Sequence, residues 1–278
     1  MLSDWLHFTR PSIWLFVLAV YAIAFFAANA TFSPVHYIGI VVFILLCTVS
    51  ITVNHYFDYK YDRKSKQLYR FPVASGKISR NFAGIFSFLL IAISITLSYT
   101  FFPLNAFYLV LFAVFMIITY SAPPARIKAR PYLETVWNGL GYGSVPYYLA
   151  LAIIGAQKTA ELHLLGLIPF LIAASGHILL QIRDIRDDKK SRTKTTSAII
   201  GQKRMIAASK LMIAFAGLII AYLAFVGFLS WPAWISLGIG ASIFTEHRKM
   251  KDVRKSYKIL QLLYIIGGLL FIASLVWI

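Results

Sequence analysis

The sequence predicts an all-α integral membrane protein, a bundle of about nine transmembrane helices around one central cavity. Of the 278 residues, 59% are hydrophobic and only 13% are charged, which is too little polar surface for a water-soluble core of this size. Long apolar runs also recur along the whole chain and are separated by short polar segments. Because backbone groups in lipid must be hydrogen-bonded within their own segment, we interpret these runs as helices.

The apolar runs define the spans in order, and several fall slightly short of the ~20 residues that a perpendicular crossing needs. The first follows Arg10 and ends at Ala28-Asn29-Ala30, which resembles a signal peptide with its cleavage site, but its length and the later helices favour a retained span. We expect one transmembrane domain over 1–278, with a pseudo-repeat marked by acidic motifs that close the second and sixth spans. The predicted spans are 12–30, 36–57, 82–101, 103–121, 139–156, 162–182, 206–229, 232–246 and 257–278.

The lysines and arginines test this helix count. If the connections alternate between the two faces of the membrane, 26 of the 27 basic residues fall on the N-terminal side, and only Lys158 falls on the other. Basic residues collect on the cytoplasmic side, so we expect a cytoplasmic N-terminus and an outside C-terminus, in the inner membrane if the source is a prokaryote. The same bias accounts for most of the net charge of +17, so we expect no nucleic-acid partner.

Five of the ten acidic residues form two clusters at the cytoplasmic ends of predicted spans. Asp58 and Asp62 are four residues apart, with Asn54 one turn before them, and Asp184 and Asp188 repeat this spacing. Residues four apart share a helix face, where two carboxylates repel each other unless a cation lies between them. Mg²⁺ prefers such oxygen ligands and commonly shares carboxylates with substrate phosphates. Ordinary helix-end charges are the plain alternative, but two pairs with one spacing favour a metal site.

Basic residues surround both clusters and indicate a diphosphate as the ligand, although each of them also suits a plain topology determinant. An ion-coupled transporter is the competing class of protein, because polytopic proteins often use membrane carboxylates. A transporter would place those carboxylates near the bilayer midplane, whereas here they lie at the predicted cytoplasmic edge. The cations near the clusters include Arg70 and Lys77 after the first, Lys189 after the second, and Arg126 and Lys128 in the YSAPPARIK segment between them.

These motifs resemble those of the UbiA superfamily of intramembrane prenyltransferases. NHYFDYKYD is similar to the family's Asn-Asp-x-x-Asp-x-x-x-Asp, and RFPVASGKIS resembles its Arg-Pro-x-x-Ser-Gly stretch. RDIRDDKKSRTKTTSAIIG resembles the family's Asp-x-x-x-Asp with its basic and Thr-rich continuation, and YSAPPARIK resembles a signature of several branches. Two positions depart from the pattern: His55 replaces a usual Asp, and Phe71 interrupts the Arg-Pro pair.

The resemblance implies a nine-helix bundle in which Mg²⁺, as two ions, bridges the carboxylates to an isoprenyl diphosphate. The allylic carbocation would then be captured by a lipophilic acceptor. Its identity stays open: the candidates are a quinone precursor, a glyceryl-phosphate lipid, a chlorophyllide-like ring and a carotenoid end. His55 would be a spectator, a weak ligand or an acceptor contact, and Asp187 a reserve ligand. The implied catalytic residues and metal ligands are Asp58, Asp62, Asp184 and Asp188, with Asn54 as a further ligand; the implied diphosphate contacts are Arg70, Lys77, Tyr120, Arg126, Lys128 and Lys189.

Overall fold

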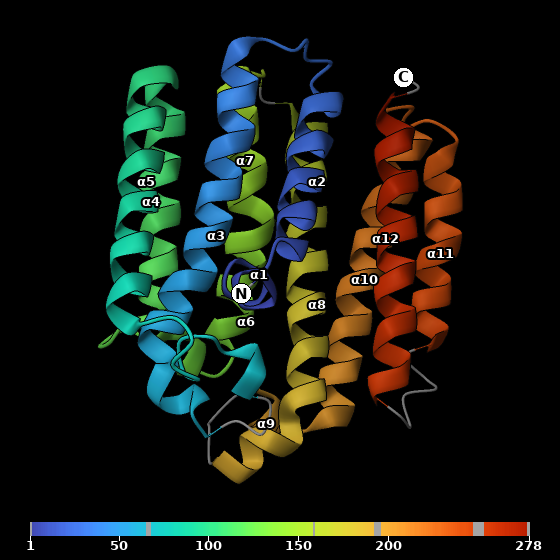
Figure 1. Ribbon diagram of the computed structural model, residues 1–278. Coiled ribbons are helices and arrows are strands. Elements are labelled where there is room, and N and C mark those ends of the chain that lie inside the picture. The colour runs from blue at the N-terminus through green and yellow to red at the C-terminus, as the bar shows by residue number, and fades with distance from the viewer. Residues whose placement is uncertain (1, 65–67, 158, 192–195, 247–252, 277–278) are drawn as a thin grey trace.

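The computed structural model describes residues 2–64, 68–157, 159–191, 196–246 and 253–276. Within these ranges, the side chains of 184–191, 198, 244–246, 253–258 and 261 lie outside the described set. The described chain is a bundle of helices without strands (Figure 1). Its elements are α1 (Leu2–Thr9), α2 (Ser12–Ala27), α3 (Pro34–Asp62), η1 (Leu68–Arg70), α4 (Arg80–Phe101), α5 (Leu104–Ser121), η2 (Ile127–Ala129), α6 (Leu133–Gly139), η3 (Leu140–Ser144), α7 (Val145–Ile154), α8 (Ala160–Ser191), α9 (Thr196–Ile200), α10 (Gln202–Phe225), α11 (Pro232–Glu246) and α12 (Val253–Val276).

Each predicted apolar run coincides with helical structure, and the protein is an integral membrane protein. Five of the described helices are long and apolar enough to cross a bilayer, or six if α1 and α2, which meet at a bend of 43°, form one span. The apolar parts of α11 and α12 are shorter, so the count of nine crossings stays a prediction. The fifth predicted span, 139–156, is divided into α6, the π-helical turn η3 and α7.

The π-helical turn η3 fits closely against α8. A Cβ added to Gly143 would lie 2.5 Å from the carbonyl carbon of Pro169, so only glycine permits this approach of the two backbones. Pro169 itself lies inside α8, where it removes one backbone hydrogen bond of the helix. The bundle therefore has an irregular layer at this level, formed by two neighbouring elements.

The two helices that carry the acidic motifs are the most enclosed of the long apolar ones. Over half of the apolar stretch is buried in both α3 and α8 (56%), against 22% in both α4 and α10. Apolar side chains such as Phe88 of α4 and Leu218 of α10 remain exposed, as expected for faces in contact with lipid. Figure 1 shows α3 and α8 ending at the same end of the bundle, so the two motifs share one end.

Candidate active site

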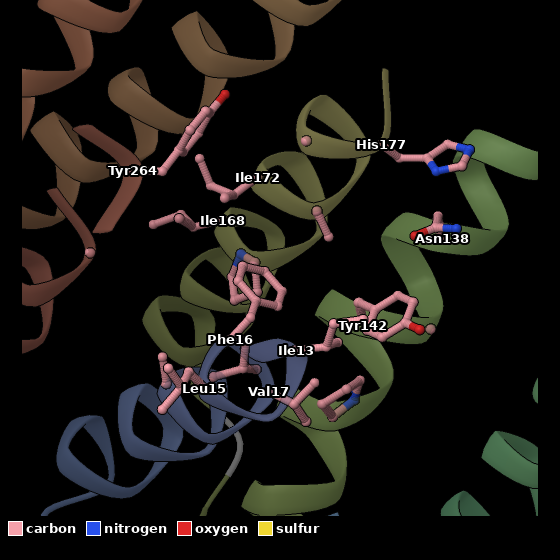
Figure 2. Close-up of a pocket in the computed structure, with 18 of the residues that line it drawn as sticks. Ile13, Leu15, Phe16, Val17, Asn138, Tyr142, Ile168, Ile172, His177 and Tyr264 are labelled. Carbon is pink, nitrogen blue, oxygen red and sulfur yellow. The ribbon is translucent and has the colours of Figure 1, made fainter. Parts of the chain in front are cut away.

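A cavity of about 1480 Å³ lies inside the bundle, as the fold class predicted. Helices α2, α3, α5, α6, α7, α8, α10, α11 and α12 all contribute to its wall, together with η3. Figure 2 shows apolar side chains of α2 and α8, among them Phe16, Ile168 and Ile172, along this wall. Asn54 near the end of α3 and Arg183 on α8 also line the cavity, so it connects an apolar interior with the end that carries the acidic motifs.

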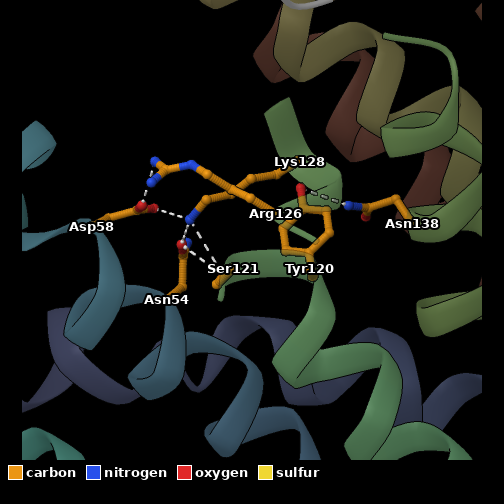
Figure 3. A network of polar contacts seen from close by, with 7 residues as sticks. All are labelled: Asn54, Asp58, Tyr120, Ser121, Arg126, Lys128 and Asn138. Carbon is orange, nitrogen blue, oxygen red and sulfur yellow. Dashed lines mark hydrogen bonds and ion pairs between the residues drawn. The ribbon is translucent and has the colours of Figure 1, made fainter. Parts of the chain in front are cut away.

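Five polar side chains meet beside the cavity in what we call the Asp58 cluster: Asn54, Asp58, Ser121, Arg126 and Lys128 (Figure 3). Lys128 Nζ donates to Asn54 Oδ1 at 2.5 Å and to Ser121 Oγ at 3.2 Å, and it forms an ion pair with Asp58 Oδ2. Arg126 Nη2 binds the other carboxylate oxygen of Asp58 at 3.0 Å. The Asp58 cluster thus joins α3 to the end of α5 and the turn that follows it.

The turn after α5 brings both cations to Asp58. It contains a cis peptide bond between Pro123 and Pro124, and Arg126 adopts a left-handed backbone conformation with φ of 37°. The backbone N–H of Arg126 donates to the carbonyl of Ala122 at 2.8 Å, which closes the turn. Burial lowers the pKa of Lys128, and the charge of Asp58 opposes this shift. The sequence predicts Arg126 and Lys128 as diphosphate contacts, and the structure brings both to the same carboxylate.

The donor atoms of the Asp58 cluster suit a hard divalent cation. In this structure the Lys128 ammonium is the cation in contact with Asn54 Oδ1, Asp58 Oδ2 and Ser121 Oγ, a set made only of oxygen atoms. Asp62 follows Asp58 by one turn at the end of α3. Among the described residues, no three His, Cys, Asp or Glu side chains converge on one point. The second motif falls on residues whose side chains lie outside the described set: Asp184, Asp187, Asp188 and Lys189.

Other predicted residues lie away from the Asp58 cluster. The His55 ring stacks on Phe8 of α1 and meets the Phe71 ring edge-on. Its Nε2 lies 3.3 Å from the carbonyl oxygen of His7, so its described contacts are with α1 and Phe71. Lys77 forms an ion pair with Asp4 at 2.6 Å.

Arg70 and Tyr120 occupy two different pockets. Arg70 lines a separate small pocket of about 380 Å³ together with Arg10. The Tyr120 hydroxyl lies at the wall of the main cavity and accepts a hydrogen bond from Asn138 Nδ2 at 3.2 Å. Of these two predicted diphosphate contacts, Tyr120 is therefore the one that reaches the central cavity.

Several polar residues at the site escaped the sequence interpretation. Arg10 and Arg183 line the main cavity and add positive charge to its wall. Glu134, which is buried, accepts hydrogen bonds from the backbone N–H and the hydroxyl of Thr196, both at 2.7 Å. Through this contact α6 holds α9, the segment that follows the second acidic motif. The sequence could have singled out Glu134 as a candidate, because the chain contains only ten acidic residues.

A largely apolar cavity inside a membrane bundle, with carboxylates and cations beside one end, is typical of intramembrane proteins that bind amphipathic ligands. The sequence profile of the UbiA prenyltransferase family matches residues 14–276. The chain therefore belongs to the UbiA prenyltransferase family and is an intramembrane prenyltransferase. This confirms the resemblance seen in the motifs and removes the reason to consider a transporter.

Individual relatives agree with this assignment. The chain is 30% identical over 206 residues to the digeranylgeranylglyceryl phosphate synthase of Thermococcus kodakarensis, covering 72% of this chain and 68% of that one. It is 23% identical over 242 residues to the lycopene elongase/hydratase of Corynebacterium glutamicum, covering 85% and 80%. A UbiA homolog from Archaeoglobus fulgidus bound to GPP and Mg²⁺ has the same fold, with a TM-score of 0.74, 24% identity and coverage of 99% and 100%.

Proposed function

We propose that this protein transfers an isoprenyl group from an isoprenyl diphosphate to a lipophilic acceptor within the membrane. The observation that carries the proposal is the continuity between the apolar cavity and the Asp58 cluster, both of which include Asn54. A prenyl diphosphate combines a long apolar chain with a compact polyanion. The cavity suits the chain, and the cations and carboxylates at its end suit the diphosphate and its counter-ions.

The metal ligands in this proposal are Asn54, Asp58 and Asp62 on α3, with Asp184 and Asp188 on α8, and we propose two Mg²⁺ ions. When bound, Mg²⁺ neutralises the charge that develops on the departing diphosphate. The Archaeoglobus homolog, which is bound to GPP and Mg²⁺, supports this choice of metal. Asp187 lies about 100° around the helix from Asp188, so the two are not expected to bind the same ion and we propose Asp187 only as a reserve ligand.

The chain's own cations complete the diphosphate site. Arg126 and Lys128 are held beside Asp58, where they are placed to bind phosphate oxygens once Mg²⁺ binds the carboxylate in their place. We also propose contributions from Arg10 and Arg183, which line the same cavity. The apolar wall around the prenyl chain excludes water, so the carbocation is captured by the acceptor rather than hydrolysed. Tyr120 and Lys189 stay further proposed contacts, whereas Arg70 and Lys77 stay peripheral ones from which we expect only a small contribution.

The relatives suggest which acceptors to test first. A digeranylgeranylglyceryl phosphate synthase indicates a glyceryl-phosphate lipid, and a lycopene elongase/hydratase indicates a carotenoid end. A quinone precursor and a chlorophyllide-like ring also belong in the panel, since the same metal chemistry serves them. For orientation we propose that the N-terminus and both acidic motifs face the cytoplasm and the C-terminus the outside, from the distribution of basic residues.

The test is consumption of geranylgeranyl or farnesyl diphosphate by the purified protein with this acceptor panel. Product with one acceptor, lost in EDTA and in the Asp58→Asn variant, would support the proposal and name the acceptor. If the protein binds prenyl diphosphate only with Mg²⁺ but forms no product, the proposed donor stands and none of the tested acceptors is the substrate. Absence of metal-dependent binding would overturn the proposal.

A further inference from the structure

Polar side chains line the cavity at a second level, deeper than the Asp58 cluster. The Tyr142 hydroxyl lies 2.9 Å from Ser50 Oγ, and Asn138 Nδ2 donates to the Tyr120 hydroxyl. Ser50 precedes Asn54 by one turn of α3, on the side of the cavity interior. With His177 on α8 these four residues form what we call the polar belt, and all five line the cavity.

His177 lies level with Asn138 across the contact between α6 and α8. Gln181 Nε2 donates to Thr135 Oγ1 at 3.3 Å, which sets the register of the two helices. The two helices run in opposite directions (Figure 1). His177, one turn before Gln181 on α8, therefore lies at the same level as Asn138, nearly one turn after Thr135 on α6. Figure 2 shows both side chains at the same end of the pocket.

His177 differs from the rest of the polar belt because its Nε2 is buried without a hydrogen-bond partner among the described residues. A buried polar atom of this kind is unfavourable unless a bound molecule completes its hydrogen bond. The neighbouring Gly176 also lines the cavity, and a Cβ added there would meet no atom within 4 Å. Open space therefore adjoins α8 at this level of the cavity, beside the residue that carries the unpaired nitrogen.

We propose that His177 Nε2 binds the hydroxyl group of the prenyl acceptor, and hence that the acceptor is a hydroxyl-bearing lipid. This inference rests on the proposed function. A hydroxyl both donates and accepts, so it satisfies Nε2 in either tautomer, whereas a hydrocarbon end offers no partner. His177 precedes Asp184 by seven residues, about 10 Å along α8. This position places the acceptor oxygen next to a prenyl chain whose diphosphate lies at the second acidic motif.

The test uses geranylgeranylglyceryl phosphate as the hydroxyl acceptor and its analogue without the free hydroxyl. We compare the wild-type protein, His177→Phe, and His177→Gln, which keeps a hydrogen-bonding group. The control is His163→Phe, the same change elsewhere on α8, where the ring contacts Tyr148 and does not line the cavity. We expect His177→Phe to raise both Kd and KM for the hydroxyl acceptor about tenfold, the equivalent of one lost hydrogen bond.

Three further readouts make the outcome unambiguous. In His177→Phe the affinity for the analogue without the hydroxyl stays unchanged, and so does Mg²⁺-dependent binding of geranylgeranyl diphosphate; His177→Gln restores most acceptor affinity. Unchanged acceptor Kd in a folded His177→Phe variant would overturn the assignment, as would equal loss in folded His177→Gln. If wild-type protein binds acceptor but no prenyl diphosphate, the proposed function fails, while acceptor Kd in the variants still decides the role of His177.

Discussion

Two lysines with the same predicted role occupy very different surroundings. Lys128 is 14% exposed, and its ammonium contacts oxygens of Asn54, Asp58 and Ser121 next to the cavity. Lys77 is 51% exposed and forms an ion pair with Asp4 of α1.

The comparison teaches that the number and burial of the oxygen partners separate these cations, whereas proximity to an acidic motif in the sequence does not. Water and salt screen an exposed pair, so it contributes little to stability or binding. An enclosed charge interacts more strongly and depends on its partners, because removal of one leaves the other uncompensated. We therefore expect large functional effects from changes in the Asp58 cluster and small ones from changes at Lys77.

The largest effect is expected for Asp58→Asn. The amide keeps an oxygen that accepts a hydrogen bond, so the variant should fold, but it loses the charge that binds both cations and the proposed metal. We expect turnover to fall by at least about 1000-fold, measured with radiolabelled prenyl diphosphate under saturating Mg²⁺. Turnover near the wild-type level would remove Asp58 from the site.

A second, smaller effect separates the two lysines directly. Lys128→Met removes a cation that faces the proposed diphosphate and should weaken Mg²⁺-dependent binding of geranylgeranyl diphosphate by about 10- to 100-fold. Lys77→Met, with the same loss of charge and length, is the matched control. Equal losses of affinity in the two variants would contradict the distinction drawn here.

A change at Glu134 tests the effect of burial on protein stability rather than on activity. This buried carboxylate accepts two hydrogen bonds from Thr196, so Glu134→Ala leaves a backbone N–H without that partner. We expect the free energy of unfolding to fall by about 1–3 kcal/mol, read from thermal melting in detergent. Thr196→Val removes one of the same hydrogen bonds, so the two changes together should cost less than the sum of their separate effects. Strict additivity would show that the contact does not link α6 to α9.

The smallest effect is expected at the peripheral pair. Asp4→Asn should change the affinity for prenyl diphosphate by less than about twofold, because its partner Lys77 is exposed and screened. The measurement is an equilibrium binding curve at two salt concentrations. A tenfold loss would indicate that α1 and Lys77 move to the diphosphate when substrate binds.

The sequence supported most of the fold and the class of enzyme. Apolar runs located the helices because bilayer thickness and backbone hydrogen bonding leave few alternatives. The spacing of Asn54, Asp58 and Asp62 placed them on one face of a helix, and α3 does continue to Asp62. Broken helices also occur in transporters, and Pro169 inside α8 and the π-helical turn η3 are irregularities of this kind, so the family match is what decides the class of protein.

By itself, the sequence determined the helices, the acidic stripe on α3 and the family, since each follows from local periodicity or contiguous motifs. The tertiary structure decided which residues meet. It brought Arg126 and Lys128 together on Asp58, turned His55 toward α1 and paired Lys77 with Asp4. It also left His177 Nε2, in the cavity wall, without a hydrogen-bond partner among the described residues. Helical periodicity states which residues share a face, but the partner of that face depends on how distant segments pack around the cavity.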